Sequence, residues 1–189
     1  MPWRPRFVAF AVAASIGLAI ASGCASPPAP PPSPPNILLV TIDTLRADRL
    51  GTGLTPALDR MSAEGLRFTG ARAAVPLTLP SHATILSGLL PPRHGVRENA
   101  TYRFDRAQPT VAMLLKNRGY ATGAVVGAFV LDRQFGLDAG FDSYDDRIPR
   151  DPNESTRLES ERRATAVTDA AVRWLESAPR GSPFFVWVA

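Results

Sequence analysis

The sequence predicts an α/β fold, a three-layer sandwich around a mostly parallel central sheet. Two observations predict it. Residues 37–42 (ILLVTI) and 184–188 (FFVWV) are continuous apolar runs rich in β-branched and aromatic residues, which is typical of parallel strands buried on both faces. Segments with helical signals alternate with strand-like runs along the chain. The length of 189 residues and the hydrophobic content of 45% suit one globular domain.

The other elements follow from local start and stop signals. Thr55 and Pro56 are a typical N-cap and first helical residue, and Gly65 ends that helix. In chain order we further expect a short strand at 66–68, helices at 80–87 and 110–118, a strand at 120–126, and a helix at 155–177 with an apolar stripe that includes Val167, Ala171 and Trp174.

The last apolar run lies at the end of the sequence. Ala189 follows it directly, although a core strand needs neighbours and an onward connection. We therefore expect residues 36–189 to be the truncated N-terminal part of a larger domain. The sheet of this part would be incomplete at the C-terminus, and the part would be inactive and poorly stable alone.

The N-terminus has the pattern of an export signal. Residues 1–23 carry Arg4 and Arg6, then an apolar run over 7–20 and small residues. Cys24, the only cysteine, follows Ala-Ser-Gly and resembles the acylated cysteine of a bacterial lipobox. We expect an exported protein that a lipid on Cys24 anchors to the periplasmic or cell-surface face of a bacterial membrane. The alternative is an ordinary signal peptide followed by a stray cysteine.

A proline-rich spacer follows Cys24, and the charged residues are scattered along the sequence. Residues 27–35 (PPAPPPSPP) favour polyproline II, so residues 24–35 would form a semi-rigid linker behind the lipidated cysteine. Loss of the two signal arginines takes the formal net charge from +4 to about +2. The remaining arginines are interspersed with carboxylates, which argues against nucleic acid as a partner.

Asp43 is the first candidate for chemistry. It directly follows the run at 37–42, and ligands of open α/β sheets collect at the carboxyl ends of the strands. A carboxylate at that edge is a good ligand for a hard cation. It could equally cap a turn or a helix, and the spacing alone leaves both interpretations open.

Thr78 is the second candidate. Pro80 as a first-turn residue puts Thr78 at a helix N-terminus, where N–H groups and the helix dipole favour an anion. A hydroxyl there could attack a phosphate or sulfate ester, or it could merely cap the helix. Judged from the residues alone, capping is the better interpretation.

The segment around Thr78 resembles a known signature. The sulfatase pattern is Cys or Ser, any residue, Pro, Ser, Arg, three residues, Leu, Thr or Ser, Gly. The residues in register here are Thr78, Pro80, Ser81, His82, Leu86, Ser87 and Gly88. The segments 36–51, 55–68, 91–99 and 119–127 also look like this family. The chain thus resembles the sulfatase family of the alkaline phosphatase superfamily over nearly all of residues 36–189, with Thr78 as the implied nucleophile.

The departures from the sulfatase pattern bear on the reaction. Sulfatases oxidise the signature Cys or Ser to formylglycine, and threonine cannot give that aldehyde because its β-carbon carries a methyl group. The signature Arg is His82, and Thr44 replaces the second Asp of an Asp-Asp pair. The Gly-Lys-Trp-His-Leu run that holds sulfate is Gly-Ala-Phe-Val-Leu at 127–131. A directly attacking Thr matches the phosphoryl-transferring branches of the superfamily.

The resemblance also implies further site residues. Asn99, which follows Thr78 by 21 residues, resembles the phosphodiesterase Asn that binds a non-bridging oxygen, and its alternative is a turn-capping loop Asn. His82 faces the site in relatives, which implies a substrate-binding or metal-shell role. Asp43 and Thr78 would be metal ligands.

The implied activity is metal-dependent hydrolysis of an ester. The metal would be zinc or manganese, or calcium if the protein is sulfatase-like, and the substrate a small-molecule, glycan or lipid ester. A phosphoric-ester hydrolase is the first choice on the nucleophile and Asn99. A sulfuric-ester hydrolase, and a non-catalytic or truncated lipoprotein, are the alternatives.

Overall fold

A computed structural model describes residues 33–149 and 160–189 of the chain. The expected signal peptide, Cys24 and most of the linker therefore lie outside the described residues, as does the start of the helix expected at 155–177. No helix in the described part combines the length and apolar character needed to cross a membrane.

The centre of the fold is a parallel sheet with the strand order β1-β4-β2-β3. The strands are β1 (Ile37–Val40), β2 (Ala121–Val125), β3 (Ser143–Asp145) and β4 (Phe184–Val188). β4 lies between β1 and β2, with Val188 opposite both Val40 and Val125. The carboxyl ends of these three strands thus meet at one edge, and the expected central position of the last run is confirmed.

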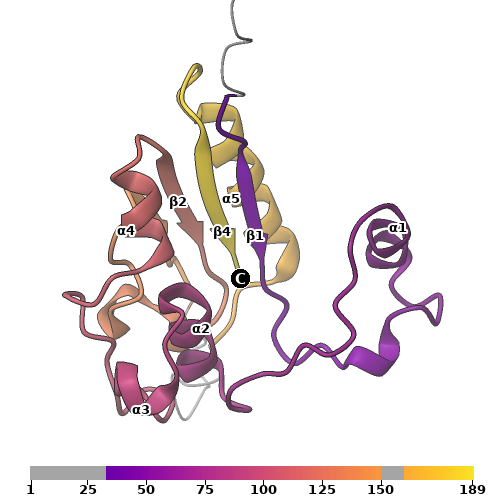
Figure 1. The fold of residues 1–189 in the computed structure, drawn as a ribbon, viewed down its shortest axis with the longest axis horizontal. Coiled ribbons are helices and arrows are strands. Elements are labelled where there is room, and N and C mark those ends of the chain that lie inside the picture. The colour runs from indigo at the N-terminus through magenta and orange to yellow at the C-terminus, as the bar shows by residue number, and fades with distance from the viewer. Residues whose placement is uncertain (1–32, 150–159) are drawn as a thin grey trace, which may run out of the picture. The chain divides into compact units, whose positions relative to one another are not determined.

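Helices cover both faces of the sheet (Figure 1). The α-helices are α1 (Pro56–Glu64), α2 (Thr78–Ser87), α3 (Pro91–His94), α4 (Val111–Lys116) and α5 (Ala164–Ser177), and the short 3-10 turns are η1 (Ala47–Arg49), η2 (Phe129–Leu131) and η3 (Arg133–Phe135). α5 packs on one face, and α2 and α4 pack on the other. This arrangement confirms the predicted α/β class and its three layers.

The alternation of strand side chains divides the core in two. Phe185 and Trp187 of β4 point into the larger hydrophobic cluster, where they meet Leu79 and Leu86 of α2. On the opposite face, a smaller cluster of Val125 with Val167, Ala170 and Ala171 holds α5 against the sheet. Since successive side chains point to opposite faces, an all-apolar strand such as FFVWV supplies both clusters at once.

Three local predictions need correction. Residues 66–68 form no strand, because Leu66 and Phe68 are 88% and 79% exposed and no neighbouring strand pairs with them. The helix expected from Pro80 begins earlier, at Thr78. Residues 160–163 are not helical, and Glu161 instead bridges to Ala128, so α5 begins at Ala164.

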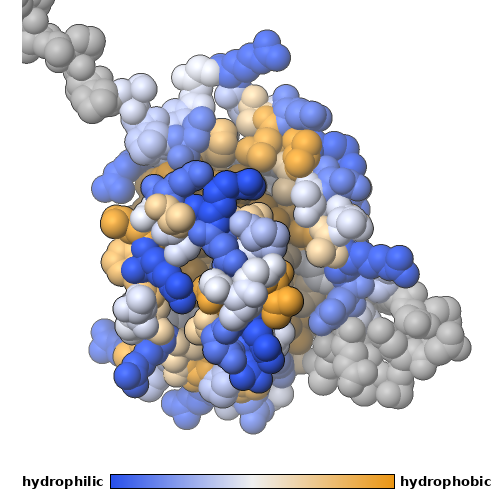
Figure 2. Space-filling view, turned by 90° about the vertical axis from the view of Figure 1, so that its right-hand side faces the viewer, coloured by the Kyte–Doolittle hydropathy of each residue, from blue (hydrophilic) through white to orange (hydrophobic). Residues whose placement is uncertain are grey.

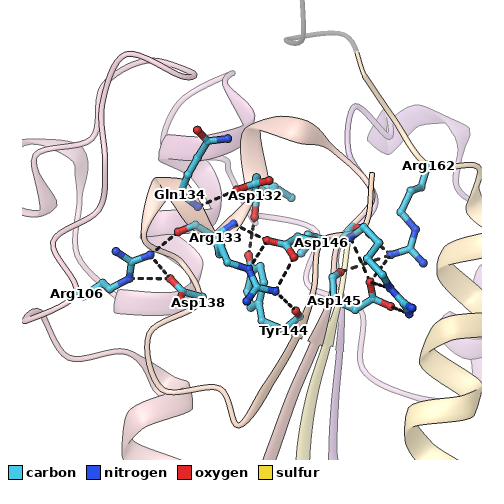
Figure 3. Close-up of polar contacts among 12 residues, drawn as sticks. Arg106, Asp132, Arg133, Gln134, Asp138, Tyr144, Asp145, Asp146 and Arg162 are labelled. Carbon is cyan, nitrogen blue, oxygen red and sulfur yellow. Dashed lines mark hydrogen bonds and ion pairs between the residues drawn. The ribbon is translucent and has the colours of Figure 1, made fainter. Parts of the chain in front are cut away.

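Ion pairs fix the loop that contains η3 and β3 (Figure 3). Arg133 binds Asp146, and Arg147 and Arg162 both bind Asp145. The side chain of Arg162 is 7% exposed and sits just before α5, so it ties the start of that helix to the end of β3. The hydrogen bonds from Arg147, followed by the nearby Arg162 charge, lower the pKa of Asp145 from 3.8 to about 2.

The α1 side of the molecule exposes apolar side chains between charged ones (Figure 2). Leu38 and Val40 of β1 are 55% and 54% exposed, because α5 covers β2 and β4 rather than β1. Met61 of α1 is exposed as well. On this face β1 is therefore less covered than β2 and β4.

Candidate active site

Asp43 lies just beyond the carboxyl end of β1. The N–H of Thr41 still bonds to the carbonyl of Val188 at 2.9 Å, so the chain leaves the sheet only after Thr41. Thr44 then turns the backbone with a φ of 54°, which is rare for a β-branched residue, and its N–H donates to Oδ1 of Asp43 at 3.1 Å. This turn holds an exposed carboxylate at the sheet edge that sequence reasoning predicted.

Thr78 is the first residue of α2, and its hydroxyl does not cap the helix. Leu77 occupies the N-cap position, and its own side chain forms no capping hydrogen bond. The Oγ of Thr78 instead donates a hydrogen bond of 2.9 Å to Oδ2 of Asp43. The structure therefore brings the predicted nucleophile and the predicted metal ligand into direct contact, although 35 residues separate them in the sequence.

Asn99 approaches the same helix end. Its Oδ1 accepts a 2.9 Å hydrogen bond from the N–H of Leu79, so Asn99 does cap the first turn. That bond uses the oxygen of the side-chain amide, and the Nδ2 donors are left without a partner among the described residues. Ala100 follows with a φ of 62°. The two residues that follow Asp43 and Asn99 thus both adopt left-handed backbone, which reverses the chain beside the site.

The first turn of α2 has few free N–H groups. Leu79 donates to Asn99, Ser81 donates to the carbonyl of Leu77 at 3.1 Å, and Pro80 has no N–H. Of the N–H groups in this turn, only that of Thr78 has no acceptor among the described residues. The expected cradle of helix N–H groups therefore reduces to this one group and the amide of Asn99.

His82 lies one turn further along α2, with 4% of its surface exposed. Its Nδ1 lies 2.8 Å from the carbonyl oxygen of Thr78, and its Nε2 lies 3.0 Å from Oγ of Thr41. Burial lowers the pKa of His82, although the hydrogen bond to Thr78 acts to raise it. The lowered pKa favours the neutral imidazole. The expected substrate-binding role of His82 stays a prediction.

The other histidine is bonded away from this site. The N–H of Val96 donates to Nδ1 of His94 at 3.1 Å, so Nε2 carries the ring proton and donates to Oγ of Thr84 at 3.0 Å. Thr84 in turn donates to the carbonyl of Pro80. Burial lowers the pKa of His94. This pair joins α3 to α2 and is structural.

A cleft of about 460 Å³ opens beside the site. Asp43, Thr78 and His82 line it, together with the rest of the segment 41–45, Ala73 and residues 75–77. No three His, Cys, Asp or Glu side chains of the described residues come together as a metal cluster. The carboxylate of Asp43 and the hydroxyl of Thr78 are nevertheless a pair of oxygen donors of the kind that a hard cation accepts.

Two residues of the site, Thr41 and Trp187, were not predicted from the sequence. Thr41 and Trp187 connect to His82, because Nε1 of Trp187 donates to Oγ of Thr41 at 3.1 Å. The position of Thr41 at a strand end, two residues before Asp43, was an available signal, whereas nothing near Trp187 in the sequence points to the site.

The run Gly127–Leu131 has a packing role. Phe129, Val130 and Leu131 form η2 and are buried in the larger hydrophobic cluster. Apolar side chains therefore occupy the positions where the sulfatase pattern has Lys and His. They cannot bind an anion, and the polar groups of the described site come from Asp43, Thr78 and Asn99 instead.

The chain matches the family described as Sulfatase over residues 35–189, and it belongs to that family. It is 40% identical to mouse steryl-sulfatase over 144 residues, which are 68% of this chain and 23% of that protein. It is 38% identical to human arylsulfatase A over 129 residues, which are 63% of this chain and 23% of that protein.

Solved structures agree with this membership. The structure of BT4656 in complex with its substrate D-glucosamine-2-N,6-O-disulfate superposes with a TM-score of 0.67 at 25% identity, and the match covers 82% of this chain and 33% of that one. A Vibrio parahaemolyticus protein of the alkaline phosphatase superfamily, 23% identical, shares the fold with a TM-score of 0.60 over 83% of this chain and 40% of that one. The chain spans about a quarter of the length of the curated relatives it matches.

Proposed function

We propose that this chain supplies the nucleophile and one metal ligand of a hydrolase that acts on sulfate esters. The observation that carries the proposal is the 2.9 Å contact between Thr78 and Asp43 at the carboxyl edge of the sheet. Membership of the sulfatase family and the similarity to curated sulfatases support sulfate as the transferred group. Small-molecule and glycan sulfate esters are the proposed substrates, by analogy with what the relatives' names state.

A divalent cation fits the donors that the chain presents. Asp43 and Thr78 would hold it, with further ligands from outside the described residues. Bound there, the cation would lower the pKa of the Thr78 hydroxyl and neutralise developing charge. Calcium suits oxygen donors and a sulfate ester, and zinc or manganese would suit phosphoryl transfer.

The first chemical step uses the described side chains directly. The Thr78 hydroxyl already donates to Asp43, so its proton can pass to that carboxylate as Oγ attacks sulfur. The bond between sulfur and the ester oxygen breaks, and the alcohol leaves after taking up a proton. The Nδ2 donors of Asn99 and the N–H of Thr78 would hydrogen-bond the other oxygens.

The second step must use water. A formylglycine hydrate can expel sulfate by itself, whereas a threonine sulfate has no second hydroxyl on its β-carbon for this elimination. Water therefore attacks sulfur, the bond to Oγ breaks, and Thr78 regains its proton. This requirement distinguishes the chain from sulfatases that carry the modified residue.

A phosphate ester is the second candidate substrate, and the unmodified hydroxyl of Thr78 is the observation that favours it. Direct attack by a hydroxyl, followed by hydrolysis or transfer of the group, is the usual course of phosphoryl chemistry on a covalent intermediate. The amide orientation at Asn99 suits a non-bridging phosphoryl oxygen equally well. The alternative of a non-catalytic lipoprotein would leave the hydroxyl of Thr78 and the Nδ2 donors of Asn99 without a chemical role.

The decisive experiment compares substrates on the purified full-length protein. We expect p-nitrophenyl sulfate to be hydrolysed faster than p-nitrophenyl phosphate or bis-p-nitrophenyl phosphate, and Thr78→Ala to abolish turnover of each. The reverse order of rates would replace the sulfate assignment with the phosphate one. Activity retained in Thr78→Ala would reject Thr78 as the nucleophile, and no turnover with any added metal would favour the non-catalytic alternative.

We also propose that the protein is exported and held at the membrane by a lipid on Cys24. The basic and apolar pattern of residues 1–23 supports export, and the Ala-Ser-Gly before Cys24 supports acylation. Labelling of cells with a tagged fatty acid should mark the wild-type protein and not Cys24→Ala. A Cys24→Ala variant that is still labelled would reject this site of attachment.

A further inference from the structure

A chain of hydrogen bonds runs from the middle of the sheet to the backbone of Thr78. Nε1 of Trp187 on β4 lies 3.1 Å from Oγ of Thr41, which lies 3.0 Å from Nε2 of His82. The other ring nitrogen of His82 lies 2.8 Å from the carbonyl oxygen of Thr78. Three segments of the chain therefore meet at one imidazole.

The indole N–H of Trp187 at one end and the carbonyl of Thr78 at the other determine where each proton of this hydrogen-bond chain lies. An indole N–H can only donate, so Thr41 accepts from Trp187 and has its single hydroxyl proton left for Nε2 of His82. A carbonyl oxygen can only accept, so Nδ1 of His82 must carry the ring proton and donate to Thr78. His82 is thereby held as the neutral Nδ1–H tautomer, with both ring nitrogens engaged inside the protein.

Burial leaves the residues of this hydrogen-bond chain little conformational freedom. Trp187 is fully buried, His82 is 4% exposed, and their ring centroids lie 5.5 Å apart. His82 borders the cleft without a free donor to offer a substrate. Any effect of its hydrogen bonds on the cleft therefore passes through Thr78, the residue that it bonds.

We propose that His82 is a positioning residue that acts through the carbonyl of Thr78. This inference rests on the proposed function, in which Thr78 is the nucleophile. The carbonyl and the hydroxyl of Thr78 belong to the same residue, so holding one in place restricts the angle at which the other meets Asp43 and the ester. The anchor of this restraint is the rigid sheet. Thr41 lies directly after β1 and still bonds to β4, and Trp187 belongs to β4.

The test uses variants of His82 in the full-length protein with the ester it hydrolyses fastest. His82→Leu removes both bonds and should lower kcat about 100-fold while KM changes less than about 3-fold, because misplacement of a reacting atom affects the chemical step. His82→Asn keeps an N–H near the position of Nδ1 and should restore kcat to within about 10-fold of wild type. A rise in KM with unchanged kcat would instead mean that His82 binds substrate, and would overturn the inference.

A matched control bonds to the same helix from α3. His94 is also a buried imidazole that bonds a threonine of α2, but it does not line the cleft. His94→Leu should lower the melting temperature about as much as His82→Leu and leave kcat unchanged. If both variants lose kcat in proportion to lost stability, the role of His82 is only structural.

A milder variant keeps the test valid if His82→Leu does not fold. Thr41→Val removes only the hydroxyl, and we expect a roughly 3- to 10-fold loss of kcat since the bond to Thr78 remains. Wild-type kcat in this variant would overturn the inferred link to the sheet. If Thr78→Ala is inactive but a folded His82→Leu variant keeps wild-type kcat, this inference alone is overturned. If Thr78→Ala is active, the proposed function is overturned, and this inference with it.

Discussion

The Oγ of Thr78 donates a 2.9 Å hydrogen bond to Oδ2 of Asp43, which joins the first turn of α2 to the end of β1. The second oxygen of Asp43 is held by the N–H of Thr44 at 3.1 Å. Both oxygens of the carboxylate are thus oriented by the protein itself. A hydroxyl and a carboxylate arranged in this way can share a cation or pass a proton.

Replacement of Asp43 tests the metal site. Asp43→Asn keeps an oxygen for the N–H of Thr44 and removes the negative charge, so we expect metal affinity to fall at least about 10-fold, and turnover to fall with it. Metal content of the full-length protein, measured by mass spectrometry after dialysis, checks this. Asp48→Asn, which affects only an exposed ion pair with Arg46, is the control and should bind metal normally. Equal metal content in both variants would remove Asp43 from the ligand set.

Replacement of Asn99 distinguishes its capping of α2 from a role in catalysis. Asn99→Asp keeps an acceptor for the N–H of Leu79 but replaces the Nδ2 donors with a second oxygen, so stability should change little. We expect kcat to fall about 100- to 1,000-fold, because a charge-stabilising donor is replaced by a like charge. Steady-state kinetics and thermal melts of the same preparation measure both effects. A fully active Asn99→Asp would show that Asn99 only caps α2.

Gly136 has no room for a side chain. Its φ is 91°, and a Cβ there would lie 2.2 Å from the carbonyl oxygen of Phe104. Gly136→Ala should therefore lower the free energy of unfolding by more than about 2 kcal/mol, since the backbone strain of about 1 kcal/mol adds to a clash with backbone. Gly119→Ala, with a φ of 84° and open space around the position, should cost about 1 kcal/mol alone. Denaturant titration compares the two, and equal losses would argue against the close approach.

The ion pairs around Asp145 predict a dependence of stability on pH. Its pKa falls from 3.8 to about 2 in the folded protein, so the charged form is favoured there. The resulting stability is fully present above about pH 4 and is lost as the pH falls toward 2. Because Arg147 is 78% exposed and screened by solvent, we expect a contribution of only about 1 kcal/mol. In Asp145→Asn the decline of unfolding free energy over this pH range should be shallower; an identical decline would contradict the assignment.

Much of the fold was predictable because its signals are local. The apolar runs of β1 and β4, the cap residues Thr55 and Gly65 of α1, and the start of α4 after Thr110 all act within a few residues. Prediction failed where local propensity met no partner, as at residues 66–68.

The start of α2 shows a different limit. Pro80 was expected at the first helical position, but it is the third residue of the helix. Proline is tolerated there because the first four N–H groups of a helix have no intrahelical acceptor in any case. β3 was missed because its three residues, Ser143–Asp145, carry no apolar pattern and pair only through β2.

The sequence by itself determined the family, through the ordered motifs of residues 36–127, and it excluded formylglycine at position 78, since a threonine cannot become that aldehyde. Only the tertiary structure decided that Thr78 contacts Asp43, which way the amide of Asn99 points, and which nitrogen of His82 carries the proton. The physical reason is that each of these depends on hydrogen bonds between different elements. The one from Trp187 to Thr41 joins residues 146 positions apart, and no local pattern encodes a contact over that distance.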